Sequence, residues 1–370
     1  LFKNVNDSLG HPVGDALLQS VAVAMAERLP ENHSIARLGG DEFVVLLEDI
    51  DDPNSAVQLA RRLLQVFTQP FQANGRELHI TASIGISVFP GDGEDMDALL
   101  ANADVAMYRA KEQGRNTYRF FKPEMSEGAA ERLRLENALR GALGRDELEL
   151  EYQPQVRLAD RCMHGAEVLL RWRHPELGEI PPARFVPIAE EAGLIIELGA
   201  WALEQACRQL ARWDAGSFLM PRLAVNLSVL QLERPRLVDE VAEVLRRTGV
   251  EPDRLELEVT ESMLMRHADQ VIANLAALRD MGVTIAVDDF GSGFSSLAYL
   301  KQLPIHRLKI DKSFVDHLTE DSNDDAIARS IIALGRGLGL DVIAEGVETE
   351  HQAEFLEREG CAEAQGFLFG

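Results

Sequence analysis

Short apolar runs alternate with longer amphipathic ones through the second half of the chain. Runs with strand composition recur at 148–156, 164–172, 222–228, 255–262, 284–290, 307–312 and 341–348. Helical patterns lie between several of them, as at 198–213, 238–247 and 268–281. Such alternation over about 220 to 240 residues predicts a TIM-like (β/α) barrel.

The first half has a different pattern, which is typical of an α+β fold. We predict helices over 14–29, 56–68 and 96–113, a β-hairpin over 34–47 and a strand over 78–89. A two-residue turn at Gly39-Gly40 closes the hairpin, so the sheet is predicted to be mainly antiparallel. The expected fold class is therefore α/β, with an antiparallel α+β domain in front of the barrel.

An amphipathic helix separates the two halves. Leu135, Leu139 and Leu143 follow one another at four-residue intervals among charged residues, and Gly144 ends the pattern. We predict three parts: a first domain over 1–122, a helical linker over 123–146 and a barrel domain over 147–370. The total of 370 residues fits two domains.

Composition narrows the function classes. The formal charge of −24 opposes binding to a nucleic-acid polymer. No apolar run approaches the roughly 18 residues that a membrane span requires. Cys162, Cys207 and Cys361 show no metal-binding or disulfide spacing, so we expect a reducing cytoplasm. Because the chain begins at Leu1 without a signal-peptide pattern, we expect a longer parent with an upstream sensory or membrane segment.

Acidic and amide residues occur within or at the end of nearly every strand of the second half. They are Glu167, Asn226, Glu258, Asp288, Asp289, Asp311 and Glu345. In a barrel such strand ends converge on one face. An all-oxygen set without His or Cys suits Mg²⁺ or Mn²⁺, and adjacent carboxylates suit a pair of ions.

Two of these features have alternative interpretations. The pair Asp288 and Asp289 ends an apolar strand, where one acid would also serve as a helix cap while the other is solvated. Lys309 alternates with Asp311, so both side chains are predicted to face the barrel interior. Lys309 alone is equally consistent with a structural salt bridge and with a role in orienting or deprotonating a water.

Eight motifs in the second half resemble those of the EAL domain family, phosphodiesterases that linearise cyclic di-GMP. They are YQP at 152–154, GAEVLLRW at 165–172, NLS at 226–228, LEVTES at 257–262, DDFGSGFSSL at 288–297, KIDK at 309–312, EGVE at 345–348 and QGFLFG at 365–370. The sequence departs from the family pattern at two points. Residues 167–169 read Glu-Val-Leu instead of the Glu-Ala-Leu that gives the family its name, and the sequence ends at Gly370, where family members usually continue.

The resemblance implies roles for individual residues. The implied ligands of a first Mg²⁺ or Mn²⁺ are Glu167, Asn226, Glu258 and Asp288, with Asp288 shared and Asp289 on a second ion. Lys309 and Glu345 are implied beside the attacking water, and Glu261 as the anchor of the loop after the aspartates. The residues implied around the dinucleotide are Gln153, Arg171, Asp311, Glu348 and Gln365. Gly291 to Ser296 is then expected to be a movable segment tied to Glu261. Leu170 and Trp172 are expected to belong to the core or to the wall of the site.

The first half resembles the GGDEF diguanylate cyclase family. The matching segments are RLGGDEFVVLL at 37–47, FKNVNDSLGHPVGDALL at 2–18 and YRAKEQGRN at 108–116. The resemblance implies GTP binding by Asn6, Asp15, Gly39, Gly40, Glu42, Lys111 and Arg115, with Asp41 on a metal ion. The family's first strand, with a metal-binding Asp, is missing, and its product-inhibition motif would fall on Pro30 and His33 and is absent.

The two resemblances together imply a bacterial signal-transduction enzyme. The barrel is expected to hydrolyse cyclic di-GMP to linear pGpG with a water activated by two metal ions, and a homodimer is expected. The first half is expected to bind GTP, as a regulator or as a cyclase in the intact parent. The alternative is a catalytically inactive cyclic di-GMP receptor that acts through a protein partner.

Overall fold

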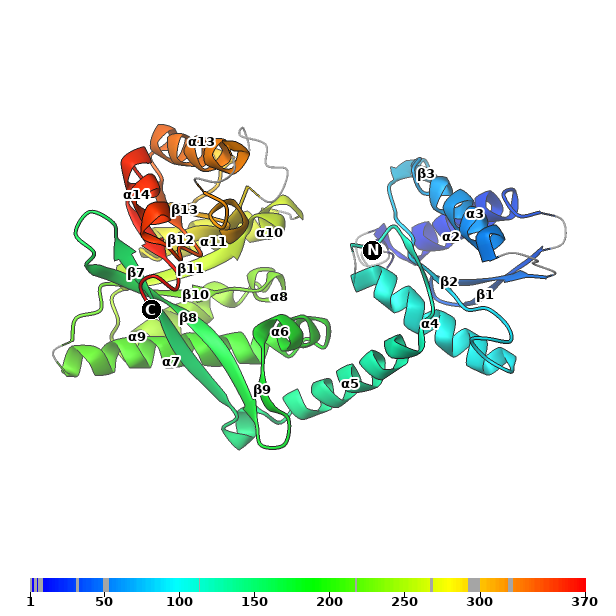
Figure 1. Ribbon diagram of the computed structural model, residues 1–370, viewed down its shortest axis with the longest axis horizontal. Coiled ribbons are helices and arrows are strands. Elements are labelled where there is room, and N and C mark those ends of the chain that lie inside the picture. Colours follow the sequence, from blue (N-terminus) through cyan, green and yellow to red (C-terminus); the bar gives the residue numbers. More distant parts are fainter. Residues whose placement is uncertain are drawn as a thin grey trace. The chain divides into compact units, whose positions relative to one another are not determined.

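The computed structural model describes residues 2, 5, 9–30, 33–48, 53–112, 114–216, 218–266, 269–291, 300–318 and 322–370. The chain divides into two compact units, Leu1–Arg134 and Leu135–Gly370 (Figure 1). Each unit has a hydrophobic core of its own. Among the described residues, every helix is too short or too polar to cross a membrane.

The first unit is a mixed α/β structure. Its elements are α2 (His11–Ala26), β1 (His33–Gly39), β2 (Glu42–Leu47), α3 (Pro53–Val66), β3 (Phe71–Ala73), β4 (Arg76–Leu78), β5 (Ile84–Ile86), α4 (Met96–Glu112), β6 (Tyr118–Phe120) and the start of α5 (Pro123–Leu139). Apolar residues of α2 and α3, such as Leu17, Val21 and Leu63, bury a common core against Phe71. Burial of this apolar surface holds the two helices together.

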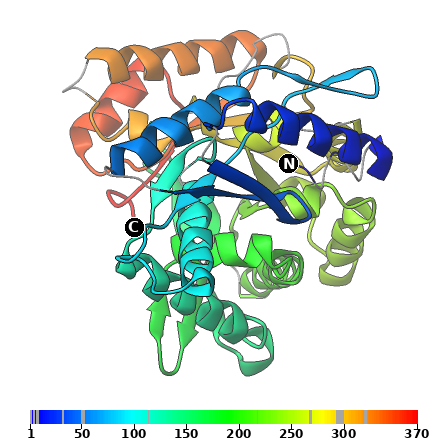
Figure 2. The same ribbon diagram turned by 90° about the vertical axis from the view of Figure 1, so that its right-hand side faces the viewer.

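The predicted hairpin is present, but its turn differs by one residue. Strands β1 and β2 pair antiparallel, with Gly39 opposite Glu42, so the turn is Gly40-Asp41 rather than Gly39-Gly40 (Figure 2, dark blue). Gly40 has a φ of 51°, a conformation that glycine adopts without steric cost. The Arg37 guanidinium donates to the Gly40 carbonyl oxygen at 2.7 Å and braces the turn.

The predicted long strand over 78–89 is wrong. Within that range Leu78 ends β4 and Ile84–Ile86 forms the separate short strand β5, which pairs with β6 in parallel rather than antiparallel. The connection between them is helix α4, and a helical crossover of this kind joins parallel strands. Gly85 permits the close packing of β5 on α4, because a Cβ there would lie 1.8 Å from the Ala103 carbonyl oxygen.

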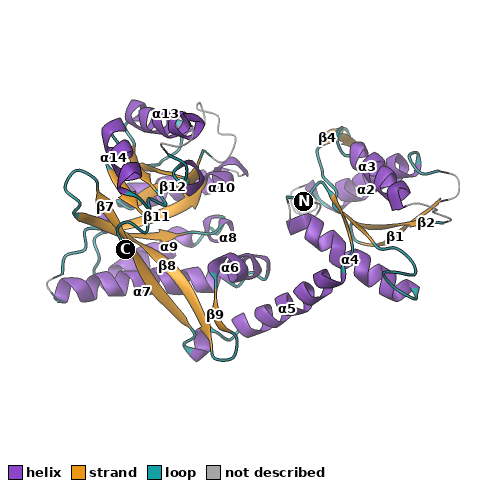
Figure 3. Cartoon of the chain, in the orientation of Figure 1, coloured by secondary structure: helices purple, strands orange, loops and turns teal. Residues whose placement is uncertain are grey.

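The second unit is a closed barrel of eight strands, β10-β11-β12-β13-β14-β15-β7-β8, in which β8 also pairs with β10. Strands and helices alternate along most of it (Figure 3). The strands are β7 (Leu148–Arg157), β8 (Met163–His174), β10 (Leu223–Asn226), β11 (Leu255–Thr260), β12 (Thr284–Phe290), β13 (Arg307–Ile310), β14 (Asp341–Ala344) and β15 (Glu363–Gln365), with β9 (Gly178–Ile180) added beside β8. The remaining elements are η1 (Leu143–Arg145), α6 (Pro182–Glu191), α7 (Ile195–Ala215), α8 (Val229–Leu232), α9 (Leu237–Thr248), η2 (Pro252–Arg254), α10 (Glu261–Arg266), α11 (Asp269–Met281), η3 (Lys312–Phe314), α13 (Ser322–Leu338) and α14 (Glu350–Glu359).

The barrel departs from strict strand-helix alternation at its start. Strand β7 is antiparallel to both of its neighbours, β8 and β15, whereas the other barrel pairs are parallel. Strands β7 and β8 form a long hairpin that continues past the barrel wall to β9 (Figure 1). Trp172 on this extension is fully buried against Phe185 and Leu139, as expected for a core residue.

Candidate active site

Lys309 lies in the barrel interior, with its side chain fully buried. Its Nζ is 2.6 Å from Glu345 Oε1, 2.7 Å from Glu258 Oε2, 3.2 Å from Asp288 Oδ1 and 3.3 Å from Glu167 Oε2. One cation thus faces four carboxylates. We call Glu167, Glu258, Asp288 and Glu345 the acid ring. Its charge exceeds that of Lys309, so a further cation would relieve the repulsion.

The parallel strands bring these residues to one end of the barrel. Asn226 is paired with Glu258 across β10 and β11, and Thr260 with Asp288 across β11 and β12. Glu345 follows directly after β14. The predicted convergence of carboxylate and amide groups at the carboxyl ends of the strands therefore occurs.

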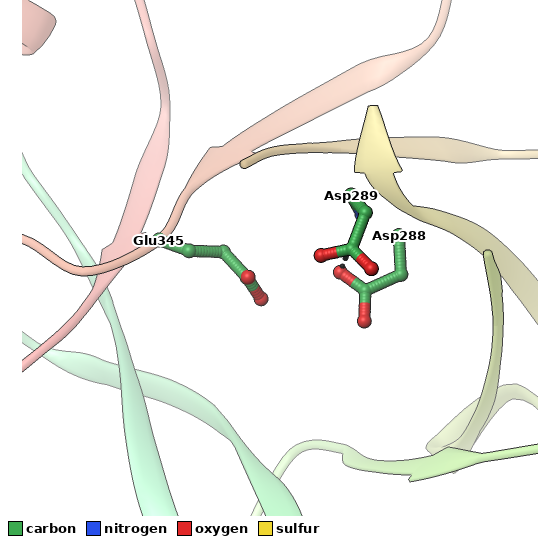
Figure 4. Close-up of side chains that lie close together, drawn as sticks. All are labelled: Asp288, Asp289 and Glu345. Atoms are coloured by element: carbon green, nitrogen blue, oxygen red, sulfur yellow. Dashed lines mark hydrogen bonds between the residues drawn. The ribbon is translucent and has the colours of Figure 1, made fainter. Parts of the chain in front are cut away.

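Asp289 faces the same site as Asp288 because the strand is distorted between them. The register of β12 against β13 shifts between Val287 and Phe290, and Asp289 has a φ of 53°. Adjacent side chains of a regular strand point to opposite faces, and this bulge removes that constraint. One carboxylate oxygen from each of Asp288, Asp289 and Glu345 lies within 4.8 Å of the others (Figure 4).

Burial and crowding shift the pKa values of the ring. Burial, followed by repulsion from Glu167, raises the pKa of Glu258 well above its usual value. Burial also raises the pKa of Glu345 to about 8 and, together with the neighbouring Asp288, that of Asp289 to about 6. Burial acts to lower the pKa of Lys309, but the carboxylates outweigh it and raise that pKa. The pKa of Glu167 is lowered instead, because Lys309, Gln365 and Asn226 outweigh its burial. The lysine is therefore held charged, while Glu258 and Glu345 resist ionisation.

Two amide side chains hold Glu167 in place. Asn226 Nδ2 donates to Glu167 Oε1 at 2.7 Å, and Gln365 Nε2 donates to Glu167 Oε2 at 2.6 Å. Gln365 Nε2 also lies 3.0 Å from Glu345 Oε1. With its nitrogen engaged, Asn226 retains its Oδ1 as the atom available to a cation.

Glu261 ties the chain after the paired aspartates to α10. It is buried, and its Oε2 accepts a hydrogen bond from the Gly291 backbone N–H at 2.9 Å. Gly291 has a φ of 103°, and a Cβ there would lie 3.0 Å from the Phe314 ring. The rest of the predicted movable segment, 292–296, lies outside the described residues.

Gln153 and Asp311, among the predicted substrate residues, lie next to residues of the site, whereas Arg171 and Glu348 form ion pairs with residues outside the acid ring. Gln153 is paired with Glu167 across β7 and β8. Arg171 Nε donates to Glu151 Oε2 at 2.7 Å, so its guanidinium is already engaged. Asp311 accepts a hydrogen bond from the Ser313 N–H at 2.7 Å and also shares one with Asp289. Glu348 is paired with Lys312.

The family comparison agrees with this geometry. Residues 136–370 match the family model of the EAL domain. The chain belongs to the EAL domain family. Residues 1–117 match the family model "Diguanylate cyclase, GGDEF domain", so the EAL domain is preceded by a GGDEF domain.

Relatives with both parts align along the whole chain. The "Bifunctional diguanylate cyclase/cyclic di-GMP phosphodiesterase MucR" of Pseudomonas aeruginosa is 50% identical over 369 residues, which are 100% of this chain and 54% of that protein. The "Cyclic di-GMP phosphodiesterase NbdA" of the same organism is 44% identical over 368 residues, 100% of this chain and 46% of that protein. The chain therefore spans about half the length of these curated relatives.

Solved EAL structures match the barrel. The structure described as "PaMucR Phosphodiesterase, c-di-GMP complex" has a TM-score of 0.61 and 51% identity, and covers 64% of this chain and 96% of that one. The cAMP and cyclic di-GMP bound form of the EAL enzyme Bd1971 has a TM-score of 0.63 and 31% identity, and covers 74% of this chain and 73% of that one.

Those residues predicted for the GGDEF half that the structure describes are exposed and lie on separate elements. Asp15 is on α2, the segment 39–42 forms the hairpin turn and its flanks, and Lys111 is in the last turn of α4. Arg115 follows α4 with a φ of 59°. Asn6 lies outside the described residues. These positions contrast with the buried acid ring of the EAL domain.

Sequence reasoning missed a second group of buried charges, at the opposite end of the EAL barrel. We call Arg222, Glu256, Arg307 and Glu363 the ion cluster. Arg307 Nη1 is 2.6 Å from Glu363 Oε2, Arg222 Nη2 is 3.0 Å from the same oxygen, and the two Nε atoms lie 3.4 and 3.2 Å from Glu256 Oε2. Glu256 lies two residues before Glu258 in LELEV, and Arg307 lies two residues before Lys309 in RLKID, so each pair shares one face of its strand. This spacing could have indicated that Glu256 and Arg307 also point into the barrel.

Proposed function

We propose that the EAL domain is a phosphodiesterase that opens cyclic di-GMP to linear pGpG. The observation that supports this proposal is the acid ring around Lys309, with the Asn226 amide bound to Glu167. The names of MucR and NbdA, and the cyclic di-GMP complex of the MucR barrel, support the same substrate.

The donor set fits two hard divalent cations, Mg²⁺ or Mn²⁺. The proposed ligands are all oxygen donors, namely Glu167, Asn226, Glu258, Asp288 and Asp289, and they carry more negative charge than Lys309 balances. When bound, such ions lower the pKa of a water and polarise the phosphodiester. Lys309 fixes the spacing of the ring, since its Nζ contacts four carboxylates at once.

Binding of the dinucleotide is assigned to residues at the end of the barrel that holds the acid ring. Gln153, Arg171, Asp311, Glu348 and Gln365 are the proposed contacts. The Arg171 guanidinium suits a phosphate oxygen, and it would exchange Glu151 for the ligand on binding. Glu345 and Glu261 complete the catalytic set, the former facing Asp288 and Asp289 and the latter holding the chain after them.

The GGDEF domain is proposed to bind GTP, as a regulator or as a diguanylate cyclase in a longer parent. Asn6, Asp15, Gly39, Gly40, Glu42, Lys111 and Arg115 are the proposed contacts, with Asp41 on a metal ion. A homodimer and a cytoplasmic location are part of this proposal. The family match of residues 1–117 and the bifunctional name of MucR support the assignment.

The decisive experiment is hydrolysis of cyclic di-GMP by the purified chain with Mg²⁺ or Mn²⁺, followed by chromatography of pGpG. We expect turnover that falls by more than about 100-fold in Glu167→Ala and in Lys309→Ala, because each removes a group from the acid ring. Glu243→Ala, on the exposed face of α9, is the matched control and should retain activity.

If the unmodified chain binds cyclic di-GMP but does not hydrolyse it, the proposal that the EAL domain is a phosphodiesterase is wrong. That result would establish the alternative, an inactive receptor acting through a protein partner.

A further inference from the structure

Gln155, which lies outside the predicted set, is fully buried in the barrel interior. It sits on β7 and is paired with Gln365 across the antiparallel β7–β15 ladder. Its Nε2 donates to Gln365 Oε1 at 3.0 Å. Among the residues that the structure describes, this hydrogen bond links Gln155 to the acid ring through Gln365.

The amide of Gln365 has to be oriented for its own contacts to form. Its Nε2 faces Glu167 Oε2 at 2.6 Å and Glu345 Oε1 at 3.0 Å. Glu167, whose pKa is lowered, accepts hydrogen bonds as a carboxylate and cannot donate them, so the Gln365 NH₂ points to Glu167 and its Oε1 points away. A donor behind Oε1 stabilises this orientation, and Gln155 Nε2 is that donor.

The neighbouring strand leaves room for the Gln155 side chain. Gly165 is opposite Gln155 on β8. A Cβ at position 165 would lie 3.0 Å from Gln155 Oε1 and 3.3 Å from the Arg222 carbonyl oxygen. A larger residue at 165 would therefore push the Gln155 amide out of its present position.

We propose that Gln155 is a positioning residue for the acid ring, which fixes the Gln365 amide so that its nitrogen holds Glu167 and Glu345 in the arrangement that binds a divalent cation. The inference rests on the proposed function, because it requires the ring to bind such a cation. Residues that orient metal ligands through a hydrogen bond typically contribute about 10- to 100-fold in metal affinity. A residue that only fills space would leave this affinity unchanged.

The test is a double-mutant cycle with Gln155→Met and Gln365→Met, since Met keeps the length of Gln but removes the donor. The Kd for Mn²⁺ is measured by calorimetry on the full chain, and unfolding in urea is followed separately. We expect Gln155→Met to raise the Kd by about 10-fold or more in the unmodified chain. In the Gln365→Met background it should change the Kd by less than about twofold.

Two further variants keep the test decisive. Gln352→Met alters a buried glutamine that caps α14, and it should leave the Mn²⁺ Kd unchanged even where it lowers stability. Should Gln155→Met fail to fold, Gly165→Ala displaces the same amide without removing it, and its rise in Kd should likewise vanish in the Gln365→Met background.

The outcomes separate the two proposals. An unmodified chain that binds no Mn²⁺ would overturn both the proposed function and this inference. Normal binding by the unmodified chain, with the same Kd in Gln155→Met or with an equal rise in both backgrounds, would overturn the inference alone.

Discussion

The two ends of the EAL barrel interior bury charges on the same strands but balance them differently. Strand β11 carries Glu256 in the ion cluster and Glu258 in the acid ring, and both are fully buried. Strand β13 likewise carries Arg307 and then Lys309. The cluster matches two glutamates with two arginines, whereas the ring places four acids around one lysine.

This difference separates a structural charge group from a binding site. Buried charges are tolerated when each is paired, and a balanced group then needs no ligand. In an unbalanced group of acids the pKa values of some members are raised, here those of Glu258 and Glu345, and a bound cation is favoured. The pKa of Glu363 in the cluster is lowered to about 2, whereas that of Glu345 in the ring is raised to about 8.

The largest expected effect is on stability, from the matched variants Glu256→Gln and Glu258→Gln. Glu256→Gln leaves two buried arginines with one acid, so we expect a loss of about 3 to 5 kcal/mol in the free energy of unfolding and an unchanged Kd for Mn²⁺. Glu258→Gln removes one acid from an excess, so we expect a smaller loss of stability and a Kd raised by more than about 10-fold. Urea unfolding and calorimetry measure the two quantities. Similar effects of both variants on both measurements would refute the distinction between the two ends.

The next effect concerns pH at the ion cluster. Burial opposes ionisation of Glu363, but Arg307 and Arg222 outweigh it and hold its pKa at about 2, below the ordinary 4.5. The folded state therefore gains stability from ionised Glu363 above pH 4.5, and this gain is lost as the pH falls from 4.5 through 2. The shift corresponds to about 3 kcal/mol.

Unfolding midpoints of the unmodified chain and Glu363→Gln, measured between pH 6 and pH 2.5, test this expectation. The difference between the unfolding midpoints of the two proteins should become smaller as the pH falls. A constant separation would show that ionisation of Glu363 contributes nothing to stability.

The smallest effect is expected from Glu261→Ala, which removes the acceptor for the Gly291 N–H at the ring end. A hydrogen bond to a charged group contributes about 1.5 to 3 kcal/mol. We expect stability to fall by about 1.5 kcal/mol, and Mn²⁺ affinity and turnover to fall with it, since Gly291 follows directly after β12. Ser262→Ala on the same helix is the control. Unchanged Mn²⁺ affinity and turnover in Glu261→Ala would show that this anchor does not act on the ring.

Much of the fold and the convergence of the acids follow from local patterns. Runs such as TIAVDDF contain β-branched residues and end at acidic ones, which indicates a strand and its end. Parallel strands of a barrel then bring the acids at their carboxyl ends to the same end of the barrel. The bulge at Asp289 is different, because it depends on the register of β12 against β13. Pairing between strands distant in sequence is not encoded in either strand alone.

The ion cluster and Gln155 were missed for a related reason. Alternation in LELEV places Glu256 and Glu258 on one face but does not reveal that Glu256 pairs with arginines and Glu258 with a lysine. Those partners, Arg222 and Arg307, come from other strands. The parallel pairing of β5 and β6 was missed because Tyr118–Phe120 is too short to show a strand pattern.

The reversed direction of β7 determines where the polypeptide joins the barrel. Leu148, its first residue, is paired with Trp172 near the end of β8, beyond Glu167, so β7 begins on the acid-bearing side. In an all-parallel barrel the first strand would begin at the opposite mouth. Helix α5 and the turn Leu143–Arg145 therefore lead the chain into the barrel at the end that holds the acid ring. The linker therefore enters the barrel beside the acid ring and not beside the ion cluster, so a displacement of the linker acts on the end that holds the unbalanced charges.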